Sequence, residues 1–276
     1  MDAQSLFFQF AQLGAHEHLL AVLLGLPRLF MLLTVAPFFG SSIITGQLRA
    51  ALVTALYLPL HPALVAEIET LRAAGSGLAL LAGSLLFKEA FIGMLMGYLA
   101  GILFWTVQSA GYFIDTQRGA SQAQIGDPLN GDETTPMGSL FFQGTIYLFF
   151  TGGAFLAFLG AVYASYEVWP VTAPLPTGLF SDMRVPLFFV GQLSRLMSSM
   201  LLLAGPVAVA CLLTDISLGL INRAAQQLNV YVLAMPIKSA VAAFLLVFYF
   251  GLVMTHARHL FSRLMEDLDM LGRLLP

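Results

Sequence analysis

The sequence predicts an all-α, polytopic membrane protein of about six hydrophobic, partly broken helices. Hydrophobic residues make up 58% of the 276 residues, whereas charged residues make up only 10%. A soluble domain carries about 25% charged residues, and the charges here cluster between long uncharged runs. Only helices or closed barrels pair every backbone group inside a bilayer, and these runs are too long for barrel strands. We therefore expect membrane helices, and a soluble protein with an unusually apolar core is the weaker alternative.

Composition also excludes several classes of function. The net charge of −3 argues against a nucleic-acid-binding protein, which would present a basic face. The single cysteine, Cys211, lies in an apolar run and is expected to be a small buried side chain. Residues 1–18 contain no Lys or Arg, so we expect no cleavable signal peptide of the usual kind. The first apolar run is then retained as a spanning helix.

Six apolar segments approach or exceed the length of about 20 residues that a bilayer crossing needs. They are residues 19–39, 50–66, 78–114, 139–166, 187–214 and 230–254. The first contains Pro27, Arg28 and Pro37, and the second is short and broken by Pro59 and Pro62.

The remaining segments differ in length and in their interruptions. Segment 78–114 is too long for one crossing, and Lys88-Glu89 mark a weak point near its start. Segment 139–166 carries no charge. Segment 187–214 is interrupted by Arg195 and by Gly205-Pro206. Segment 230–254 contains Pro236 and Lys238 near its start.

Three connections carry further information. Residues 115–138 form the longest polar stretch and contain several turn-forming pairs. Residues 167–186 are rich in proline and are expected to be ordered but not helical. Residues 255–276 form an amphipathic tail, in which arginines alternate at helical spacing with apolar residues: Arg258, Arg263 and Arg273 with Leu260, Phe261, Leu264, Leu268 and Leu271.

The distribution of Lys and Arg favours an outside N-terminus and a cytoplasmic C-terminus. The N-terminal flank has no basic residue, and the tail has three arginines. Six full crossings would place both ends on the same side. Either the orientation differs or one segment, most simply the broken 50–66, does not cross fully.

Three glycines, Gly93, Gly97 and Gly101, recur every four residues on one helical face. This spacing permits close helix–helix approach in an apolar setting. It predicts a tight seam, within the chain or to a neighbouring subunit, and chance in a glycine-rich chain is the alternative.

Five ionisable residues lie inside or beside apolar runs: Arg28, Lys88, Glu89, Arg195 and Lys238. Such charges are costly in a membrane and normally pair or face a polar cavity. They predict a polar lining or a subunit contact, unless the helices end at these positions. Adjacent helical residues do not face each other, so Lys88 and Glu89 are each expected to need another partner.

No catalytic, cofactor or metal site is expected. His16-Glu17-His18 lacks the spacing of a zinc-binding helix, and His256 with His259 is expected to be solvated. Asp115 and Arg118, three residues apart, are expected to brace a loop as an ion pair. Without a plausible acid–base or metal constellation, we expect no enzyme activity. The chain also lacks a nucleotide-binding loop, so we expect any energy for transport to come from elsewhere.

Two motifs carry a resemblance to a known family. Residues 111–119 read Gly-Tyr-Phe-Ile-Asp-Thr-Gln-Arg-Gly and precede Asp127-Pro128, Gly131 and Pro136. The stretch 219–238 keeps Arg223, Gln227, Leu228, Asn229, Val230, Met235, Pro236 and Lys238. With the Ala36-Pro37 entry, these residues resemble the SctT/FliR family of bacterial type III secretion over nearly the whole chain. The chain departs from the family at Gln226, where proline is usual. The two motifs look more like the injectisome branch than the flagellar branch.

The resemblance implies an export-gate subunit of the bacterial inner membrane, with helices arranged as hairpins. It implies SctR-, SctS- and SctU-type partners, with unfolded secreted proteins in transit. The implied gate domain covers residues 1–254, with an SctR-like part at about 1–186 and an SctS-like part at about 187–254, followed by the tail 255–276. The alternative function is a small-solute secondary transporter, although we find no internal repeat.

The resemblance also implies two sets of site residues. The first is a pore plug at about 115–128, whose polar and glycine residues suit a watery channel: Asp115, Gln117, Arg118, Gly119, Ser121, Gln122, Gln124, Gly126, Asp127 and Pro128. The second set consists of candidates for helix packing or subunit contact: Gly93, Gly97, Gly101, Arg223, Gln227, Asn229, Pro236 and Lys238.

Overall fold

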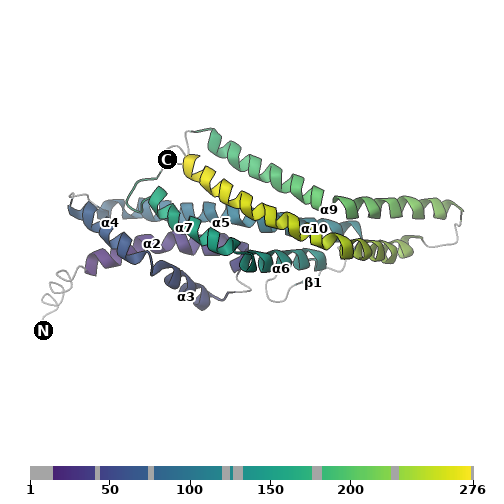
Figure 1. Cartoon of the computed structure of the whole chain (residues 1–276), viewed down its shortest axis with the longest axis horizontal. Helices are drawn as coiled ribbons and strands as arrows, with labels where there is room; N and C mark the ends of the chain where they lie inside the picture. Colours follow the sequence, from purple (N-terminus) through teal and green to yellow (C-terminus); the bar gives the residue numbers. More distant parts are fainter. Residues whose placement is uncertain are drawn as a thin grey trace. The chain divides into compact units, whose positions relative to one another are not determined.

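The fold is almost entirely helical. The computed structural model describes residues 15–40, 44–73, 78–119, 125–126, 133–175, 182–224 and 230–274. Its elements (Figure 1) are α2 (Ala15–Val35), the 3-10 helix η1 (Pro37–Phe39), α3 (Gly46–Tyr57), α4 (His61–Ala73), α5 (Leu78–Gln117), β1 (Ile125–Gly126), β2 (Glu133–Thr134), α6 (Pro136–Thr151), α7 (Ala154–Val168), α9 (Arg184–Ala224) and α10 (Val230–Leu274).

Within this described part, four helices are long and apolar enough to cross a membrane. The number rises to six if each of two bent helix pairs counts as one span. The predicted class, an all-α polytopic membrane protein, is therefore confirmed. The exception is a two-residue ribbon in which Ile125 pairs with Thr134 and Gly126 pairs with Glu133.

The second predicted segment is a broken helix, as its prolines indicated. Helices α3 and α4 meet at a bend of 63°. Pro59 lies in the turn between them, and Pro62 is the second residue of α4. Proline lacks the amide hydrogen of a helix interior and is tolerated in the first turn, so the bend falls where the sequence places it.

The fourth predicted segment is not one helix, which is a correction. Helix α6 ends at Thr151 and α7 begins at Ala154. Gly153 between them has φ of +78°, a conformation that glycine adopts without the steric cost met by other residues. Two glycines in an apolar run give no polar signal, so the break was missed.

Helix α5 is continuous through Lys88 and Glu89, so the predicted weak point there is wrong. Its 40 residues correspond to about 60 Å at 1.5 Å per residue, roughly twice a hydrocarbon core. The segment is too long for one upright crossing, as predicted. It is also the most enclosed candidate span, with 72% of its apolar window buried.

The chain divides into two compact units. The first comprises described residues within 1–101, 158–185 and 267–276, and the second those within 102–157 and 186–266. Helices α5, α7 and α10 contribute to both. The partition into parts 1–186 and 187–254 stays a prediction.

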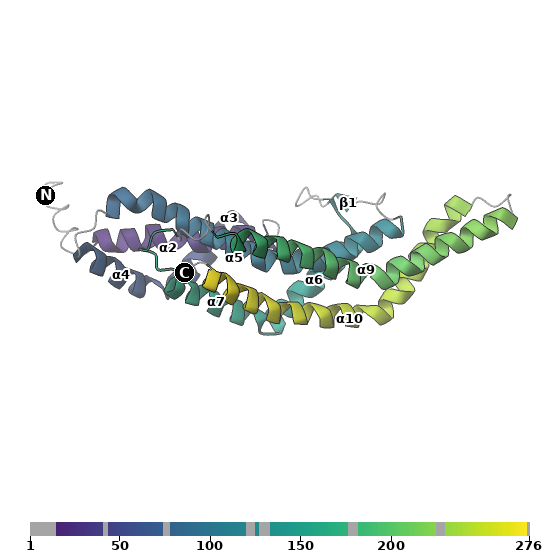
Figure 2. The same ribbon diagram turned by 90° about the horizontal axis from the view of Figure 1, so that it is seen from above.

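In the first unit, α2 packs against α3, α4 and the first half of α5 (Figure 2). A Cβ atom on Gly93 would lie 2.1 Å from the carbonyl oxygen of Arg28, and one on Gly97 would lie 2.9 Å from that of Leu32. Helices α5 and α2 therefore approach closely at these glycines. Helix α4 also comes close to α2, because a Cβ on Gly25 would lie 2.6 Å from Cδ1 of Leu64.

In the second unit, α9 and α10 run antiparallel as a long hairpin (Figures 1 and 2). Pro206 and Pro236 lie inside these helices without ending them. One apolar core joins the hairpin to α5 and α6, and it contains Val107, Ala110, Ile114, Phe141, Leu203, Ala204, Val207, Cys211, Ala242, Leu246, Val253 and Ala257. Cys211 is buried, as expected.

The C-terminal tail is not a separate segment, because it continues α10 to Leu274. Its amphipathic character is confirmed, since Leu264, Leu268 and Leu271 are buried whereas Arg258 and Arg263 are exposed. The proline-rich connection is non-helical at residues 169–175 and 182–183, as predicted. Its predicted ends were too wide, because residues 167–168 belong to α7 and residues 184–186 to α9.

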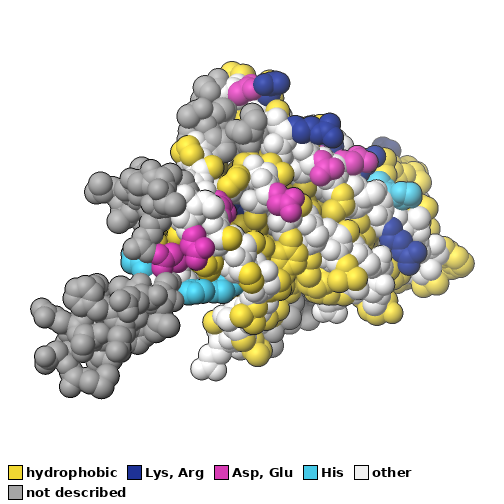
Figure 3. Space-filling view, turned by 60° about the vertical axis from the view of Figure 1, so that its left-hand side comes forward, with side chains coloured by type: hydrophobic (Ala, Val, Ile, Leu, Met, Phe, Trp, Pro, Cys, Tyr) yellow, Lys and Arg dark blue, Asp and Glu magenta, His cyan; other side chains and the backbone are white. Residues whose placement is uncertain are grey.

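Much of the apolar side-chain surface is exposed. Only 28% of the apolar window of α9 and 17% of that of α10 are buried. Val247 and Phe248 on α10 are 77% and 73% exposed. On the face drawn in Figure 3, hydrophobic side chains cover broad areas between a few charged groups. These surfaces need lipid or another protein to cover them.

Candidate functional site

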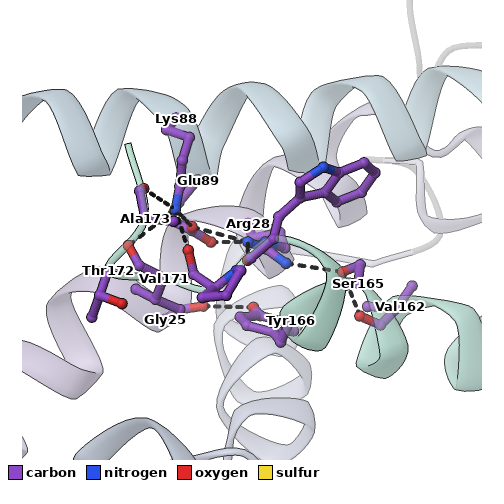
Figure 4. Close-up of polar contacts among 12 residues, drawn as sticks. Gly25, Arg28, Lys88, Glu89, Val162, Ser165, Tyr166, Val171, Thr172 and Ala173 are labelled. Carbon is purple, nitrogen blue, oxygen red and sulfur yellow. Dashed lines mark hydrogen bonds and ion pairs between the residues drawn. The ribbon is translucent and has the colours of Figure 1, made fainter. Parts of the chain in front are cut away.

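Four charged residues of the first unit surround the irregular segment that follows α7. They are Arg28 on α2, Glu67 on α4, and Lys88 and Glu89 on α5, and we call them the charged clamp. The side chains of Arg28, Lys88 and Glu89 are at most 1% exposed. Figure 4 shows three of these side chains converging on the backbone of residues 171–173 and on α7.

Arg28 lies at the centre of the clamp. Its Nε donates to Oε2 of Glu89 at 2.7 Å and its Nη2 donates to Oε1 at 2.9 Å, a two-pronged ion pair. Its Nη1 donates to Oγ of Ser165 at 3.0 Å, and Nη2 also donates to the Trp169 carbonyl at 2.8 Å. The guanidinium lies 4.0 Å from the centre of the Tyr166 ring. These contacts satisfy donors on all three nitrogens of a buried cation and cover one face of it.

Lys88 binds four oxygen atoms at once. Its Nζ donates to the carbonyls of Pro170, Val171 and Ala173 at 2.6, 3.0 and 2.9 Å. It also lies 2.8 Å from Oε1 of Glu89. Each of the two residues has a further partner, as expected, because Glu89 also pairs with Arg28 and Lys88 also binds three carbonyls. The expectation that Lys88 and Glu89 do not face each other is wrong. Their side chains leave the helix in different directions, but both are long enough for their ends to meet beside the same backbone.

Glu67 completes the clamp from α4. Its Oε1 accepts from the amide of Thr172 at 3.1 Å and also from the Thr172 hydroxyl. Residues 169–173 are thus each held by a charged side chain, with carbonyls on cations and Thr172 on a carboxylate. Carbonyls beyond a helix end lack intrahelical partners, and irregular backbone in a membrane protein must be satisfied by protein groups. The clamp supplies those groups.

A second cluster closes the polar loop in the second unit. Asp115 is fully buried near the end of α5. Its Oδ1 accepts from Nε of Arg118 at 2.7 Å, and its Oδ2 accepts from the amide of Met137 at 2.8 Å. The predicted Asp115–Arg118 ion pair is present, and the bond from the Met137 amide to Asp115 joins the start of α6 to the end of α5. The loop itself therefore spans residues 118–135.

Two glycines and one threonine shape this loop base. A Cβ on Gly111 would lie 2.5 Å from the Met137 carbonyl oxygen, so α5 and α6 meet closely there. Thr135 caps α6 by accepting from the amide of Gly138. Gly119 has φ of +81° and faces the side chain of Met235 on α10. The base of the loop is thus packed against helices of the second unit.

The other predicted plug residues are only partly described. Gln117 is the last residue of α5, Arg118 and Gly119 form a turn, and Gly126 lies in β1. Ser121, Gln122, Gln124, Asp127 and Pro128 lie outside the described residues.

The predicted packing and contact residues separate into three groups. Gly93 and Gly97 contact α2 of the same chain, and Gly101 is buried. Lys238 forms an ion pair with Asp215 of α9 at 3.0 Å. Arg223 and Pro236 are exposed, whereas Gln227 and Asn229 lie outside the described residues.

Sequence reasoning missed Glu67, Ser165, Thr172 and Asp215. Glu67 lies one residue beyond the predicted apolar segment 50–66, and its partner Thr172 is 105 residues away. The one available signal was indirect: a non-helical segment in a membrane protein needs polar side chains to bind its backbone, and Glu67 is such a side chain.

The N-terminal histidine pair does not gather a metal-binding set. His18 Nδ1 lies 3.0 Å from His61 Nε2, and His61 Nδ1 is 2.7 Å from the hydroxyl of Tyr57. The two imidazole rings are also stacked, with their centroids 5.1 Å apart. Among the described residues, no group of three potential ligands could hold a metal ion.

Comparison with known proteins places the chain in a family. The family described as "Bacterial export proteins, family 1" matches residues 19–264. The chain is 39% identical over 254 residues to Yop proteins translocation protein T of Yersinia pestis, covering 92% of this chain and 94% of that protein. It is 27% identical over 242 residues to surface presentation of antigens protein SpaR of Salmonella typhimurium, covering 87% and 86% of the two chains.

A flagellar relative extends the comparison. The chain is 29% identical over 184 residues to flagellar biosynthetic protein FliR of Bacillus subtilis, covering 67% of this chain and 70% of that protein. The family match spans both the charged clamp and the loop base. The chain therefore belongs to family 1 of the bacterial export proteins, the SctT/FliR-type components of type III secretion and flagellar export apparatus.

Proposed function

We propose that the chain is a non-enzymatic subunit of the type III secretion export gate in the bacterial inner membrane. With SctR- and SctS-type partners it forms the entry pore for unfolded secreted proteins. The loop at about 115–128 plugs that pore at rest, and an SctU-type subunit contacts the gate from the cytoplasm, where the C-terminus lies. The higher identity to the Yersinia translocation protein than to FliR favours the injectisome branch.

The exposed apolar surface of α9 and α10 is the observation that carries the assembly proposal. Less than a third of either apolar window is buried within the chain. A helix surrounded by its own protein would be enclosed like α5, so these helices require neighbours. Hairpins that present apolar faces along most of their length suit lateral packing against similar subunits.

The anchored base of the loop supports the plug proposal. Buried Asp115 fixes both ends of the loop through Arg118 and Met137. A plug needs a rigid base, so that its tip returns to the same position after each displacement. The polar residues between those ends tolerate water, as a pore-lining segment must.

Copurification tests the assembly. The tagged full chain is extracted in a mild detergent, and the bound proteins are identified by mass spectrometry. A gate subunit brings SctR- and SctS-type proteins with it. Recovery of the chain alone or as a homo-oligomer, together with uptake of a small solute into vesicles, would instead establish the transporter alternative.

Ion leakage tests the plug. Deleting residues 120–124 leaves Asp115, Arg118 and Gly119 in place and shortens the proposed plug by five residues. The deletion is expected to raise ion leakage through the assembled gate in resting cells. A matched control replaces the same five residues with glycine and serine, so that the length of the loop is unchanged. Leakage in this control shows whether the pore is blocked by the length of the loop or by its particular side chains. Unchanged leakage in the deletion variant rejects the plug role.

A further inference from the structure

The first unit carries an apolar groove that is separate from the charged clamp and from the loop. It lies between α2, α3 and α5 and has a volume of about 670 Å³. No charged side chain lines it. The lining residues are Leu19, Val22, Leu23, Leu26, Pro27, Phe30, Met31, Ala50, Val53, Thr54, Leu86 and Ala90.

The groove offers almost no polar contact. Thr54 is the one lining residue with a polar side chain, and its hydroxyl already donates to the carbonyl of Ala50 at 2.9 Å. A charged or strongly polar occupant would lose its hydration there without a compensating bond. The lining of the groove therefore favours a hydrocarbon occupant.

The length of the groove fits one lipid tail. Along α2 it runs from Leu19 to Met31, which is about 18 Å at 1.5 Å per residue. One leaflet contributes about half of a hydrocarbon core of roughly 30 Å. Helix α2 is itself a candidate span from His16 to Val35, so the groove lies along the part of the helix suited to the bilayer interior.

An arginine with spare donors lies near one end of the groove. Arg49 directly precedes Ala50 and stands one turn before Val53, both of which line the groove. Its Nη2 donates to the carbonyl of Phe39, just beyond the end of α2, at 3.2 Å. Its Nε is buried and has no acceptor among the described residues. The side chain as a whole is half-buried, and no carboxylate of the described part of the chain pairs with it. An arginine at the end of a span is placed to meet lipid headgroups.

We propose that this groove holds one acyl chain of an anionic phospholipid, whose phosphate is bound by Arg49. The guanidinium matches phosphate in charge and in the geometry of its donors. The groove takes the tail, and Arg49 selects the headgroup. This site neither requires nor tests the proposed export role, because lipid binding is measured directly.

The experiment compares lipid retention and stability in the purified full chain, together with any subunits that copurify with it. Phospholipid carried through purification is quantified by mass spectrometry. The delipidated sample is then heated with phosphatidylglycerol, phosphatidylcholine or inorganic phosphate. We expect retained phosphatidylglycerol, and a rise in Tm with that lipid that exceeds the rise with phosphatidylcholine. Inorganic phosphate is expected to have no effect, because the tail supplies most of the binding.

Two variants and two matched controls locate the site. Arg49→Gln is expected to weaken phosphatidylglycerol binding about fivefold, the usual effect of one basic residue on an anionic lipid. Thr54→Phe fills the groove and is expected to abolish retention. Leu48→Phe, on the same helix but outside the groove, and Arg258→Gln, an exposed arginine on α10, are expected to behave as the unmodified chain.

Three results would overturn the proposal. Unchanged lipid retention in both Arg49→Gln and Thr54→Phe means that no specific lipid site exists. Loss of a protein subunit from Thr54→Phe with lipid retention unchanged means that a partner helix fills the groove. Equal stabilisation by inorganic phosphate means that only the anion is bound. If Thr54→Phe fails to fold, the headgroup preference of the unmodified chain and of Arg49→Gln still decides.

Discussion

Buried charge is the dominant feature at the scale of single residues. In the charged clamp, Glu89 is the shared counter-ion of Arg28 and Lys88, and all three side chains are enclosed. Removing one member of such a group leaves an uncompensated charge inside the protein. This lowers the stability of the fold more than replacing the whole group with apolar side chains would. The clamp therefore behaves as a unit, and its weakest point is its shared carboxylate.

Glu89→Gln tests this dependence. The substitution keeps the size of the side chain but removes the negative charge between two buried cations. We expect a loss of about 3–5 kcal/mol in the free energy of unfolding, seen as a lower Tm and poor accumulation in membranes. Glu69→Gln on the exposed face of α4 is the control and is expected to stay within about 0.5 kcal/mol. Equal stability of the two variants would contradict the buried ion pairs.

Asp115→Asn tests the base of the loop. The amide keeps the shape of the carboxylate but loses its charge-assisted bonds to Arg118 and to the Met137 amide. Such bonds contribute about 1.5–3 kcal/mol, so we expect faster protease cleavage within residues 118–135. Asp215→Asn, whose carboxylate side chain is 44% exposed, is the matched control. A cleavage rate at residues 118–135 that is the same in both variants argues against Asp115 as the anchor.

The sequence predicted that the intramembrane charges would find partners, but it did not identify those partners. Lys88 binds three backbone carbonyls. Every residue has a backbone carbonyl, so the sequence does not show which ones accept these bonds. Asp115 was predicted to pair with Arg118 because their spacing fixes the contact locally. Its bond to Met137 depends on how α5 meets α6, which no local pattern reveals.

At the scale of elements, close helix approach depends on single glycines. The four-residue spacing of Gly93 and Gly97 predicted a seam without naming its partner, and α2 is that partner for both. Prolines showed where α3 and α4 separate. The glycines between α6 and α7 gave no comparable signal, because an apolar run with glycine is equally typical of a continuous membrane helix.

Gly93→Ala tests the seam between α2 and α5. The added methyl group would lie 2.1 Å from the backbone oxygen of Arg28, and a backbone cannot move aside as a flexible side chain does. We expect a loss of about 1–3 kcal/mol from overpacking. Gly83→Ala in the same helix meets no atom within 4 Å, and it is expected to stabilise the helix by about 0.5–1 kcal/mol. Thermal unfolding of both variants should therefore shift in opposite directions, and a shared direction would contradict the seam.

At the scale of the whole molecule, the described helices leave large apolar faces exposed, chiefly on α9 and α10. Hydropathy located all six apolar segments, because each must reach the length of a bilayer crossing. It did not reveal that α5 would be enclosed while α9 and α10 stay open, since both kinds of helix are equally apolar in composition. Enclosure is a property of tertiary packing. The open helices therefore identify the surfaces on which the proposed assembly depends.

A lysine placed on the open face of α10 distinguishes a covered surface from a solvated one. Val247 is 77% exposed within the chain. If lipid or a neighbouring subunit covers it, Val247→Lys places a charge in an apolar setting at a cost of about 2.5–3.5 kcal/mol. We then expect roughly a hundredfold less correctly inserted or assembled protein, measured in alkaline-washed membranes and by recovery of bound subunits. Ser262→Lys, exposed on the same helix among the tail arginines, is the control, because that face already carries positive charge. A solvated surface would accept both lysines equally, so equal recovery of the two variants would remove the main support for lateral assembly through α9 and α10.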